Sequence, residues 1–315
     1  MANLAYLQVT RECNQECRFC SNPPTGKTIS LESAKKIVDD YIAKGFEGLV
    51  LGGGEPTLYP GLAELIKYSA KKKFPCRIIS NGQKTADFKY FRSLVAAGLK
   101  HICISVYSDD ARIQAFLTKN KDSLSNIRKT LNNAKKLKIN VDVAMTINRY
   151  NAGHLSRVVS WLVREYPFIR HFTWNNLDPA MNRASENPDT IPRFFDLEVE
   201  LHQAMCFLEE NARTFRVERV PLCYMTEFAQ CSTDARRIVR KEERMDYFLD
   251  EKGLKTQKRT SYGKSECCRA CSLNEICPGL YQMDRYYSSK ELFPVFVSKD
   301  RVIKRILAVS QGKSQ

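Results

Sequence analysis

Three cysteines with the spacing C-x3-C-x2-C stand near the start of the chain, in the stretch TRECNQECRFCSNPP: Cys13, Cys17 and Cys20. Thiolates bind zinc and iron–sulfur clusters. A structural zinc site needs four protein ligands, and no fourth cysteine or histidine follows close behind. A [4Fe–4S] cluster held by three thiolates instead keeps one iron open to an outside ligand. The spacing therefore indicates a metal centre with one open position, and a zinc site is the alternative.

A glycine-rich stretch, LVLGGGEPTLYP, follows at residues 49–60 and contains Gly52, Gly53, Gly54 and Glu55 directly after a predicted strand. Consecutive glycines let the backbone approach a ligand that a Cβ atom would hold away. A plain tight turn is the alternative. If a ligand does lie there, a side chain at Gly53 weakens its binding and leaves folding nearly unchanged.

A second cysteine motif lies near the other end of the chain, in ECCRACSLNEICPGLY, where Cys268, Cys271 and Cys277 have the spacing C-x2-C-x5-C. Cys223 precedes them by about 45 residues, and we expect it at the end of a strand that reaches Leu222. A zinc ribbon is the alternative, since cysteine pairs across a long gap are also its signature.

The composition narrows the class of protein. The chain has 315 residues and twelve cysteines, and most of these thiols are clustered, which favours metal binding in a reducing compartment over disulfides. Cys76, Cys103 and Cys206 lie in apolar stretches and are expected to be buried structural thiols. With no signal peptide and no run of about 18 apolar residues, we expect a cytoplasmic protein without a membrane partner. The net charge of +15 suits an acidic partner or a widely solvated basic surface.

Short β-branched runs alternate with amphipathic helical patterns from residue 5 to about residue 175, which is typical of repeated βα units around a parallel sheet. Six strands are predicted: Ala5–Thr10, Gly48–Leu51, Cys76–Ser80, His101–Val106, Val141–Ile147 and His171–Trp174. Six units are too few for a closed eight-fold barrel, so an open partial barrel is expected.

A stretch rich in Asn, Pro and Asp from Asn175 to Pro192 marks a boundary, and a helical pattern follows it. The sequence therefore predicts four segments. They are a barrel at 1–190, a linker helix at 191–213, a cysteine-rich unit at 214–296, and a C-terminal helix and tail at 297–315.

Taken together, C-x3-C-x2-C with Phe19 inside it, GGGEP after the second strand and a six-fold βα frame resemble the radical S-adenosylmethionine (SAM) superfamily. The resemblance covers about residues 5–190. It implies a [4Fe–4S] cluster whose open iron is chelated by the amino and carboxylate groups of SAM. It also implies reductive cleavage to a 5′-deoxyadenosyl radical that abstracts hydrogen from the substrate, and an external electron donor such as flavodoxin or ferredoxin.

The same resemblance implies a set of residues that contact SAM: Phe19, Gly52, Gly53, Gly54, Glu55, Ser80, Asn81, Ser105 and Asn148. Ser80 and Asn81 lie at the end of strand three, Ser105 ends strand four and Asn148 follows strand five; a role as a turn residue or strand cap is the alternative for each. Members with peptide substrates often carry an arginine after strand four that grips the SAM carboxylate. Here that stretch reads AFLTKN, with Thr118 and Lys119.

The C-terminal motif resembles the auxiliary-cluster domains called SPASM and twitch. The implied fold is a partial (β/α)6 TIM-like barrel of the α/β class followed by a small α+β twitch/SPASM-like domain. Tyr281 stands where the full SPASM pattern has a further cysteine, which favours one auxiliary [4Fe–4S] cluster on Cys223, Cys268, Cys271 and Cys277. Cys231 and Cys267 are reserve ligands.

Enzymes with such domains mostly modify ribosomally made peptides, so oxidation or cross-linking of a peptide is the leading expectation. A radical SAM reaction on a small molecule or on RNA is the second. A zinc-dependent nucleic-acid-binding protein is a distant third.

Overall fold

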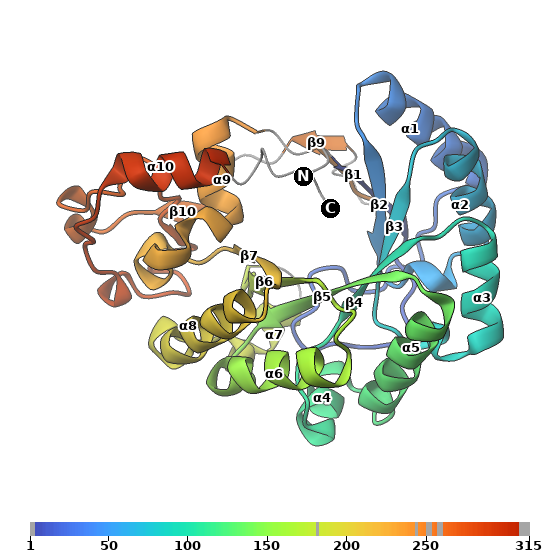
Figure 1. The fold of residues 1–315 in the computed structure, drawn as a ribbon, viewed down its shortest axis with the longest axis horizontal. Coiled ribbons are helices and arrows are strands. Elements are labelled where there is room, and N and C mark those ends of the chain that lie inside the picture. Colours follow the sequence, from blue (N-terminus) through green and yellow to red (C-terminus); the bar gives the residue numbers. More distant parts are fainter. Residues whose placement is uncertain (1–3, 181–182, 243–244, 250–253, 257–260, 309–315) are drawn as a thin grey trace.

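The structure is a computed structural model that describes residues 4–180, 183–242, 245–249, 254–256 and 261–308. Over these residues one nine-stranded sheet has the order β7-β6-β5-β4-β3-β2-β1-β8-β9. Strands β1 to β7 are parallel and adjacent in chain order, so each βα unit adds one strand. The sheet curves, and helices lie along its outer side (Figure 1). The predicted fold class, a partial α/β barrel followed by a small cysteine-bearing region, is confirmed.

Seven parallel strands, β1 to β7, follow one another through the described residues where the sequence predicted six. They are β1 Leu4–Thr10, β2 Gly48–Gly53, β3 Cys76–Ser80, β4 His101–Ser105, β5 Asn140–Ile147, β6 His171–Asn176 and β7 Thr214–Glu218. The first six match the predicted strands to within two residues at each end. The seventh was expected in the cysteine-rich unit, but it pairs with β6 along its whole length.

Helices connect these strands along the outer side of the sheet. They are α1 Leu31–Ala43, α2 Leu62–Lys71, α3 Phe88–Ala96, α4 Ala111–Thr118, α5 Ser123–Leu137, α6 Leu155–Glu165, α7 Arg183–Glu186 and α8 Phe194–Glu210. Helix α1 begins where the Ser30 hydroxyl accepts a hydrogen bond from the Ser33 N–H at 3.1 Å. It ends before Gly45, whose φ of +77° favours glycine.

Helix α8, predicted as a linker, packs against α6 and so serves as the crossover between β6 and β7. Its residues Leu197, Leu201 and Leu208 belong to the same buried cluster as the strands. The polar stretch before α8 concealed this seventh βα unit from sequence reasoning, because Asn, Pro and Asp are as common in long βα loops as in linkers.

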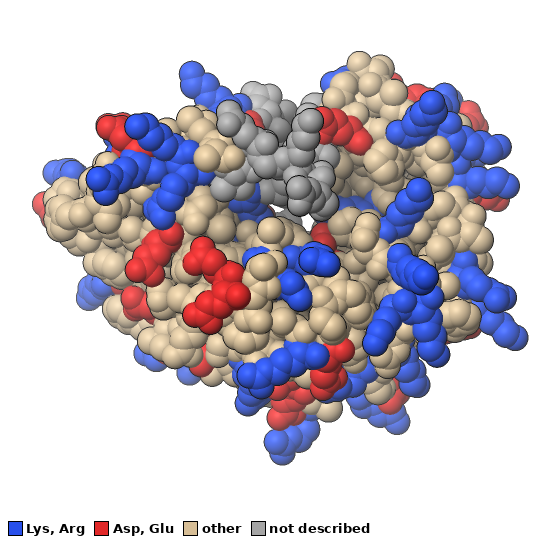
Figure 2. Space-filling model, viewed as in Figure 1, with Lys and Arg blue, Asp and Glu red and all other residues tan. Residues whose placement is uncertain are grey.

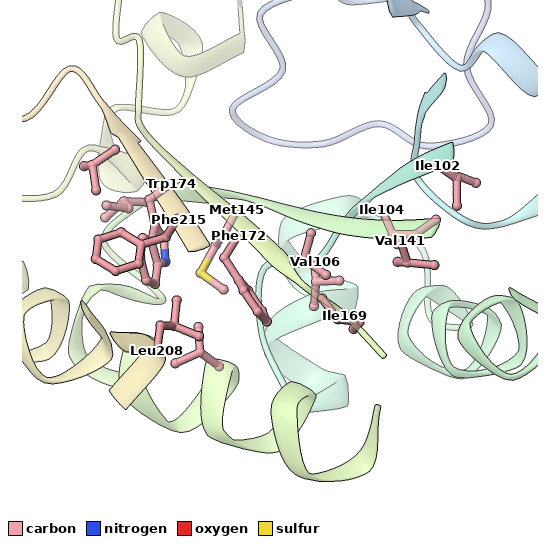
Figure 3. Packing of buried hydrophobic residues seen from close by; sticks show 14 of the residues in the cluster. Ile102, Ile104, Val106, Val141, Met145, Ile169, Phe172, Trp174, Leu208 and Phe215 are labelled. Carbon is pink, nitrogen blue, oxygen red and sulfur yellow. The ribbon is translucent and has the colours of Figure 1, made fainter. Parts of the chain in front are cut away.

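The core lies between the outer face of the sheet and these helices. Ile104 of β4, Met145 of β5 and Phe172 of β6 point the same way and are at most 2% exposed (Figure 3). Leu208 of α8 approaches them from the helical layer (Figure 3). Each such burial stabilises the fold by about 1.5–3 kcal/mol. The carboxyl ends of the strands are thereby held in place for a site.

The C-terminal part of the chain meets both edges of this sheet. Strand β8, Met245–Tyr247, pairs in parallel with β1, and β9, Leu254–Thr256, lies antiparallel to β8. A separate two-stranded antiparallel sheet joins β10, Tyr262–Gly263, to β11, Leu280–Tyr281. Helices α9, Thr233–Arg240, and α10, Lys299–Ala308, pack against each other beside it.

The surface carries many basic side chains, which project around the rim formed by α1, α2 and α3 (Figure 2). In the described part of the chain, no helix is both long enough and apolar enough to cross a membrane.

Candidate metal and cofactor site

The three cysteines of the first motif lie in the loop after β1, at the carboxyl end of the sheet, and all are half-buried free thiols. Burial raises the pKa of Cys13 to about 11 and also raises the pKa values of Cys17 and Cys20. A charge on Cys20 further raises the pKa of Cys13 and Cys17, so the three sulfurs lie near one another. A metal centre that binds thiolates would offset these penalties.

The cysteine loop is fastened to the end of α4. The backbone N–H groups of Glu16 and Arg18 donate to the carbonyls of Thr118 and Leu117 at 3.2 and 2.9 Å. Lys119 forms an ion pair with Glu16 at 3.7 Å. The segment in which related enzymes carry an arginine thus supports the cysteine loop in this protein.

Phe19, predicted to contact SAM, is 5% exposed and lies inside a small apolar cluster. Its ring meets Tyr107 edge-on, with 4.8 Å between ring centroids. Leu117, Leu177 and Ala184 complete the cluster. These contacts anchor the loop between Cys17 and Cys20 to α4 and α7, so Phe19 has a structural role whatever else it touches.

The three glycines at the carboxyl end of β2 are required by the protein's own packing. Gly53 has a φ of +128°, and a Cβ atom there would lie 2.1 Å from the Thr10 carbonyl oxygen. At Gly54 a Cβ atom would lie 2.2 Å from the Glu12 carbonyl oxygen, and at Gly52 it would strike an aromatic ring of β1. The expectation that a side chain at Gly53 leaves folding nearly unchanged is therefore wrong.

Glu55 is 1% exposed, and both of its carboxylate oxygens accept hydrogen bonds from the protein. Oε1 accepts from the Thr57 N–H and hydroxyl at 3.0 and 2.6 Å and from the Ser80 hydroxyl at 2.9 Å. Oε2 accepts from the Asn81 N–H at 2.7 Å. Burial raises the pKa of Glu55, and these donors oppose the shift. The carboxylate thus joins the ends of β2 and β3.

Asn81 connects this junction to the cysteine loop. Its Nδ2 donates to Asn14 Oδ1 at 2.7 Å and to Cys13 Sγ at 3.8 Å. Ser80, in contrast, is 1% exposed, and its hydroxyl also accepts from the Gly82 N–H at 3.1 Å. Of the two predicted contacts after β3, Asn81 reaches the cysteines and Ser80 is engaged in the core.

The predicted contacts at the end of β4 and after β5 are Ser105 and Asn148. Ser105 lies beside the half-buried Tyr107 and opposes the burial-driven rise in the pKa of the Tyr107 hydroxyl. Asn148 is fully buried; its Nδ2 donates to the Thr146 carbonyl and its Oδ1 accepts from the Tyr150 N–H, both at 3.0 Å. Asn148 therefore caps the turn after β5, the alternative that the sequence left open.

Two residues near the triad were not singled out from the sequence. Burial raises the pKa of Tyr107, and charges on Cys17, Cys20 and Cys13 raise it further; the charge of Arg183 opposes the burial-driven rise in the pKa of all three thiols. Tyr107 lies two positions after Ser105, so its position just after a strand could have marked it in the sequence as a candidate site residue. Arg183 lies in the polar stretch after β6 that resembled a linker.

The second cysteine set lines one cavity in the C-terminal region: Cys223, Cys268, Cys271 and Cys277. Cys223 enters on the short 3-10 turn Leu222–Tyr224, since β7 ends at Glu218 and no strand reaches Leu222. Burial raises the pKa of Cys223 to about 12.

Backbone N–H groups point at two of these sulfurs. Cys277 Sγ accepts from the N–H groups of Leu222 and Gly279 at 3.5 and 3.4 Å. Cys271 Sγ accepts from the Val295 N–H at 3.4 Å. Such hydrogen bonds stabilise thiolates and tune the reduction potential of a cluster that they hold.

The two reserve cysteines lie outside the lining of this cavity. Cys231 lies beside Arg216, whose charge lowers the pKa of the Cys231 thiol, while burial raises that pKa to about 11. Cys267 contacts the Ser265 hydroxyl at 2.9 Å and donates to the Leu292 carbonyl at 3.5 Å.

Three remaining thiols were expected to be buried and structural. Cys76 and Cys103 are buried, as predicted. Cys206 is only half-buried and lies 3.5 Å from His202 Nε2, so it is more accessible than expected.

The two thiol sets can be compared with the donor sets of zinc sites and of iron–sulfur clusters. A tetrahedral zinc with Zn–S bonds of about 2.3 Å draws its sulfurs to within about 3.8 Å of one another. In the part of the chain that is described, no three His, Cys, Asp or Glu side chains converge to hold a single ion. Three thiols near one another and four thiols around one cavity match the donor sets of an open and a closed [4Fe–4S] cluster.

The C-terminal region is fastened to the same end of the barrel. Arg219 Nε donates to the Asn176 carbonyl at 2.9 Å, and the Arg219 N–H donates to Asp234 at 2.8 Å. The Tyr281 hydroxyl donates to Asp178 at 2.9 Å. The auxiliary cysteines are thereby tied to the carboxyl ends of β6 and β7, where the cofactor loops also lie.

Residues 7–162 match the family model of the Radical SAM superfamily, and the chain belongs to this superfamily. The chain is 30% identical over 166 residues to the sporulation killing factor maturation protein SkfB of Bacillus subtilis (strain 168). That match covers 52% of this chain and 40% of SkfB, so it leaves more than half of that relative unmatched.

Two solved structures share the fold at low identity. Streptococcus suis SuiB bound to S-adenosylmethionine has a TM-score of 0.65 at 14% identity, over 89% of this chain and 73% of SuiB. Native anSMEcpe with bound AdoMet has a TM-score of 0.64 at 14% identity, over 98% and 97% of the two chains. SuiB is also seen with the precursor peptide SuiA, and anSMEcpe with the Cp18Cys peptide.

Proposed function

We propose that this protein is a SAM-cleaving enzyme in which Cys13, Cys17 and Cys20 hold a [4Fe–4S] cluster with one iron open to SAM. The observation that carries the proposal is the set of three neighbouring thiols in the loop after β1, within the segment that matches the superfamily model. When bound, the cluster and SAM would supply a 5′-deoxyadenosyl radical that abstracts hydrogen from the substrate.

The protein's own contribution is to hold the thiols in one arrangement. Backbone bonds from Glu16 and Arg18 fix the cysteine loop to α4, and Phe19 packs its middle into an apolar cluster. Glu55 keeps the ends of β2 and β3 in register, so that the Asn81 amide can donate to Cys13. This support keeps the reacting groups positioned while apolar side chains exclude water.

Four further thiols, those of Cys223, Cys268, Cys271 and Cys277, would hold an auxiliary [4Fe–4S] cluster in the C-terminal cavity. Because all four irons would have protein ligands, this cluster would exchange electrons with a substrate radical and would not bind SAM. That role favours an oxidation or a cross-link as the outcome of the reaction.

We propose a ribosomally made peptide as the substrate. SkfB is a maturation protein, and SuiB and anSMEcpe have been seen with peptides bound. The net charge of +15 would attract an acidic leader segment. Transfer of an electron from a peptide radical to the auxiliary cluster would suit this substrate class.

The test is anaerobic reconstitution with iron and sulfide, followed by reduction in the presence of SAM and a short peptide encoded beside the gene. We expect 5′-deoxyadenosine and a change in peptide mass. Absence of 5′-deoxyadenosine from a protein that has bound its iron would reject SAM cleavage. Cleavage with no change in peptide, together with RNA affinity that falls steeply with salt, would reject the peptide in favour of RNA.

A further inference from the structure

Arg183 begins α7 in the loop after β6, where no sequence motif pointed to a function. Its neighbour Ala184 packs in one apolar cluster with Phe19, which lies inside the cysteine motif. Helix α7 therefore lies directly against the cysteine loop. The charge of Arg183 acts on all three thiols of the triad.

One terminal nitrogen of Arg183 has no acceptor. Nη1 is buried, and no described residue accepts a hydrogen bond from it. The other buried guanidinium nitrogens without acceptors in the described ranges are all Nε atoms. Among the described residues, Arg183 is therefore the one arginine with such an atom at the end of its side chain. Leaving a charged donor buried without an acceptor is unfavourable, so this atom can take an acceptor from outside the protein, and an anion suits its charge.

The other cations near the triad are engaged. Arg11 Nη2 donates to the Pro23 carbonyl at 2.8 Å. Lys119, in the segment where related enzymes carry an arginine, forms an ion pair with Glu16 at 3.7 Å. Neither presents a buried terminal donor that lacks an acceptor.

We propose that the Arg183 guanidinium binds the methionine carboxylate of SAM, from the loop after β6 instead of the loop after β4. This inference rests on the proposed function, since SAM must bind at the triad for its carboxylate to come near Arg183. A guanidinium fork suits a carboxylate because it can donate two parallel hydrogen bonds. A carboxylate of the substrate is the other possible source of the same chemistry.

The test measures affinity for SAM and for decarboxylated SAM by anaerobic equilibrium dialysis of the reconstituted protein. Arg183→Met removes the charge with little loss of volume, and Arg183→Lys keeps the charge without the fork. Arg193→Met is the matched control, because Arg193 is exposed and paired with Asp196 at 2.6 Å. Iron content and circular dichroism are measured for every variant.

We expect Arg183→Met to lose about 10- to 100-fold in affinity for SAM, the range of a charge-assisted hydrogen bond, and less than about twofold for decarboxylated SAM. Arg183→Lys should lie between that variant and the wild type, and Arg193→Met should match the wild type. Equal losses for both ligands, or unchanged SAM affinity with weaker binding of substrate, would overturn the proposal. So would loss of iron in both Arg183 variants, since the guanidinium would then serve the cluster or the fold. Wild-type protein that loads iron but binds no SAM would instead refute the proposed function.

Discussion

The two cysteine sets of this protein are built in different ways. The triad Cys13, Cys17 and Cys20 comes from one short loop, which is fastened to α4 by backbone hydrogen bonds. The auxiliary set combines Cys223, on a 3-10 turn after β7, with three cysteines from a later loop. The first set is local in sequence, and the second depends on a contact between distant segments.

The two sites also differ in the groups that surround their sulfur atoms and in the number of ligand positions that the thiols leave open. Around the triad, donors such as the Asn81 amide and the unpaired Arg183 nitrogen come from other loops, and three thiols leave a metal position free. Around the auxiliary cavity four thiols would fill every ligand position, and the backbone N–H groups of Leu222, Gly279 and Val295 point at sulfur, as the Asn22 N–H does at Cys20 in the triad. The first arrangement suits binding of an exogenous ligand, and the second suits electron transfer.

Changing Cys13, Cys17 and Cys20 together to Ala should give the largest effect. We expect 5′-deoxyadenosine formation to fall to background, because no protein ligand for the open cluster remains. Liquid chromatography of the quenched reaction measures this, and the auxiliary cluster should keep its absorbance near 400 nm. Unchanged SAM cleavage in this variant would contradict the assignment of the triad.

Changing Cys223, Cys268, Cys271 and Cys277 together to Ala should separate the two sites. Iron should fall from about eight to about four per chain, the content of two and of one [4Fe–4S] cluster. SAM cleavage without substrate should largely survive, while product formation should fall because the electron path is cut. Zinc in place of the lost iron, in protein purified without air, would make the C-terminal region structural.

The contribution of a distant segment to the auxiliary set can be tested with single changes. Cys223→Ala should remove or destabilise the auxiliary cluster, since Cys223 lines the cavity. Cys231→Ala is the matched control, because Cys231 lies in the same region but outside that lining. Iron analysis and the visible spectrum distinguish them. A cluster that survives in the first variant and is lost in the second would reverse the assignment.

The glycine turn should have a smaller effect, on stability. Gly53→Ala should lower the free energy of unfolding by about 1–3 kcal/mol, because φ is +128° and the new Cβ atom would meet the Thr10 carbonyl. Gly153→Ala, where nothing lies within 4 Å of the added atom, should change it by less than about 1 kcal/mol. Urea unfolding of the two variants measures both. Equal stability would show that the turn relaxes without strain.

Sequence reasoning succeeded where the signal is local. Six strands follow from short-range pattern, and both cysteine motifs are visible as spacing. It failed for β7, because the polar residues before α8 are compatible with either a linker or a long βα loop. Sequence reasoning attributed the glycines to a nearby ligand. In the structure their close neighbours instead belong to β1 and the loop after it, and no local pattern reveals such a contact. A role for Arg183 can be recognised only from the fold, in which α7 packs against Phe19.

The pairing of β1 with β8 also bears on how the chain is made. Strand β1 finds one neighbour, β2, soon after it is synthesised, but its other neighbour, β8, follows only after β2 to β7 have been made. Until β8 is made, the short stretch of β1 that pairs with it is an open strand edge, with which strands of other nascent chains can pair. Synthesis of β8, which lies in the chain between Cys223 and the other three cysteines of the auxiliary set, therefore covers this part of the edge. The strand that completes the sheet beside β1 and the second set of thiols are thus made in the same stage of synthesis.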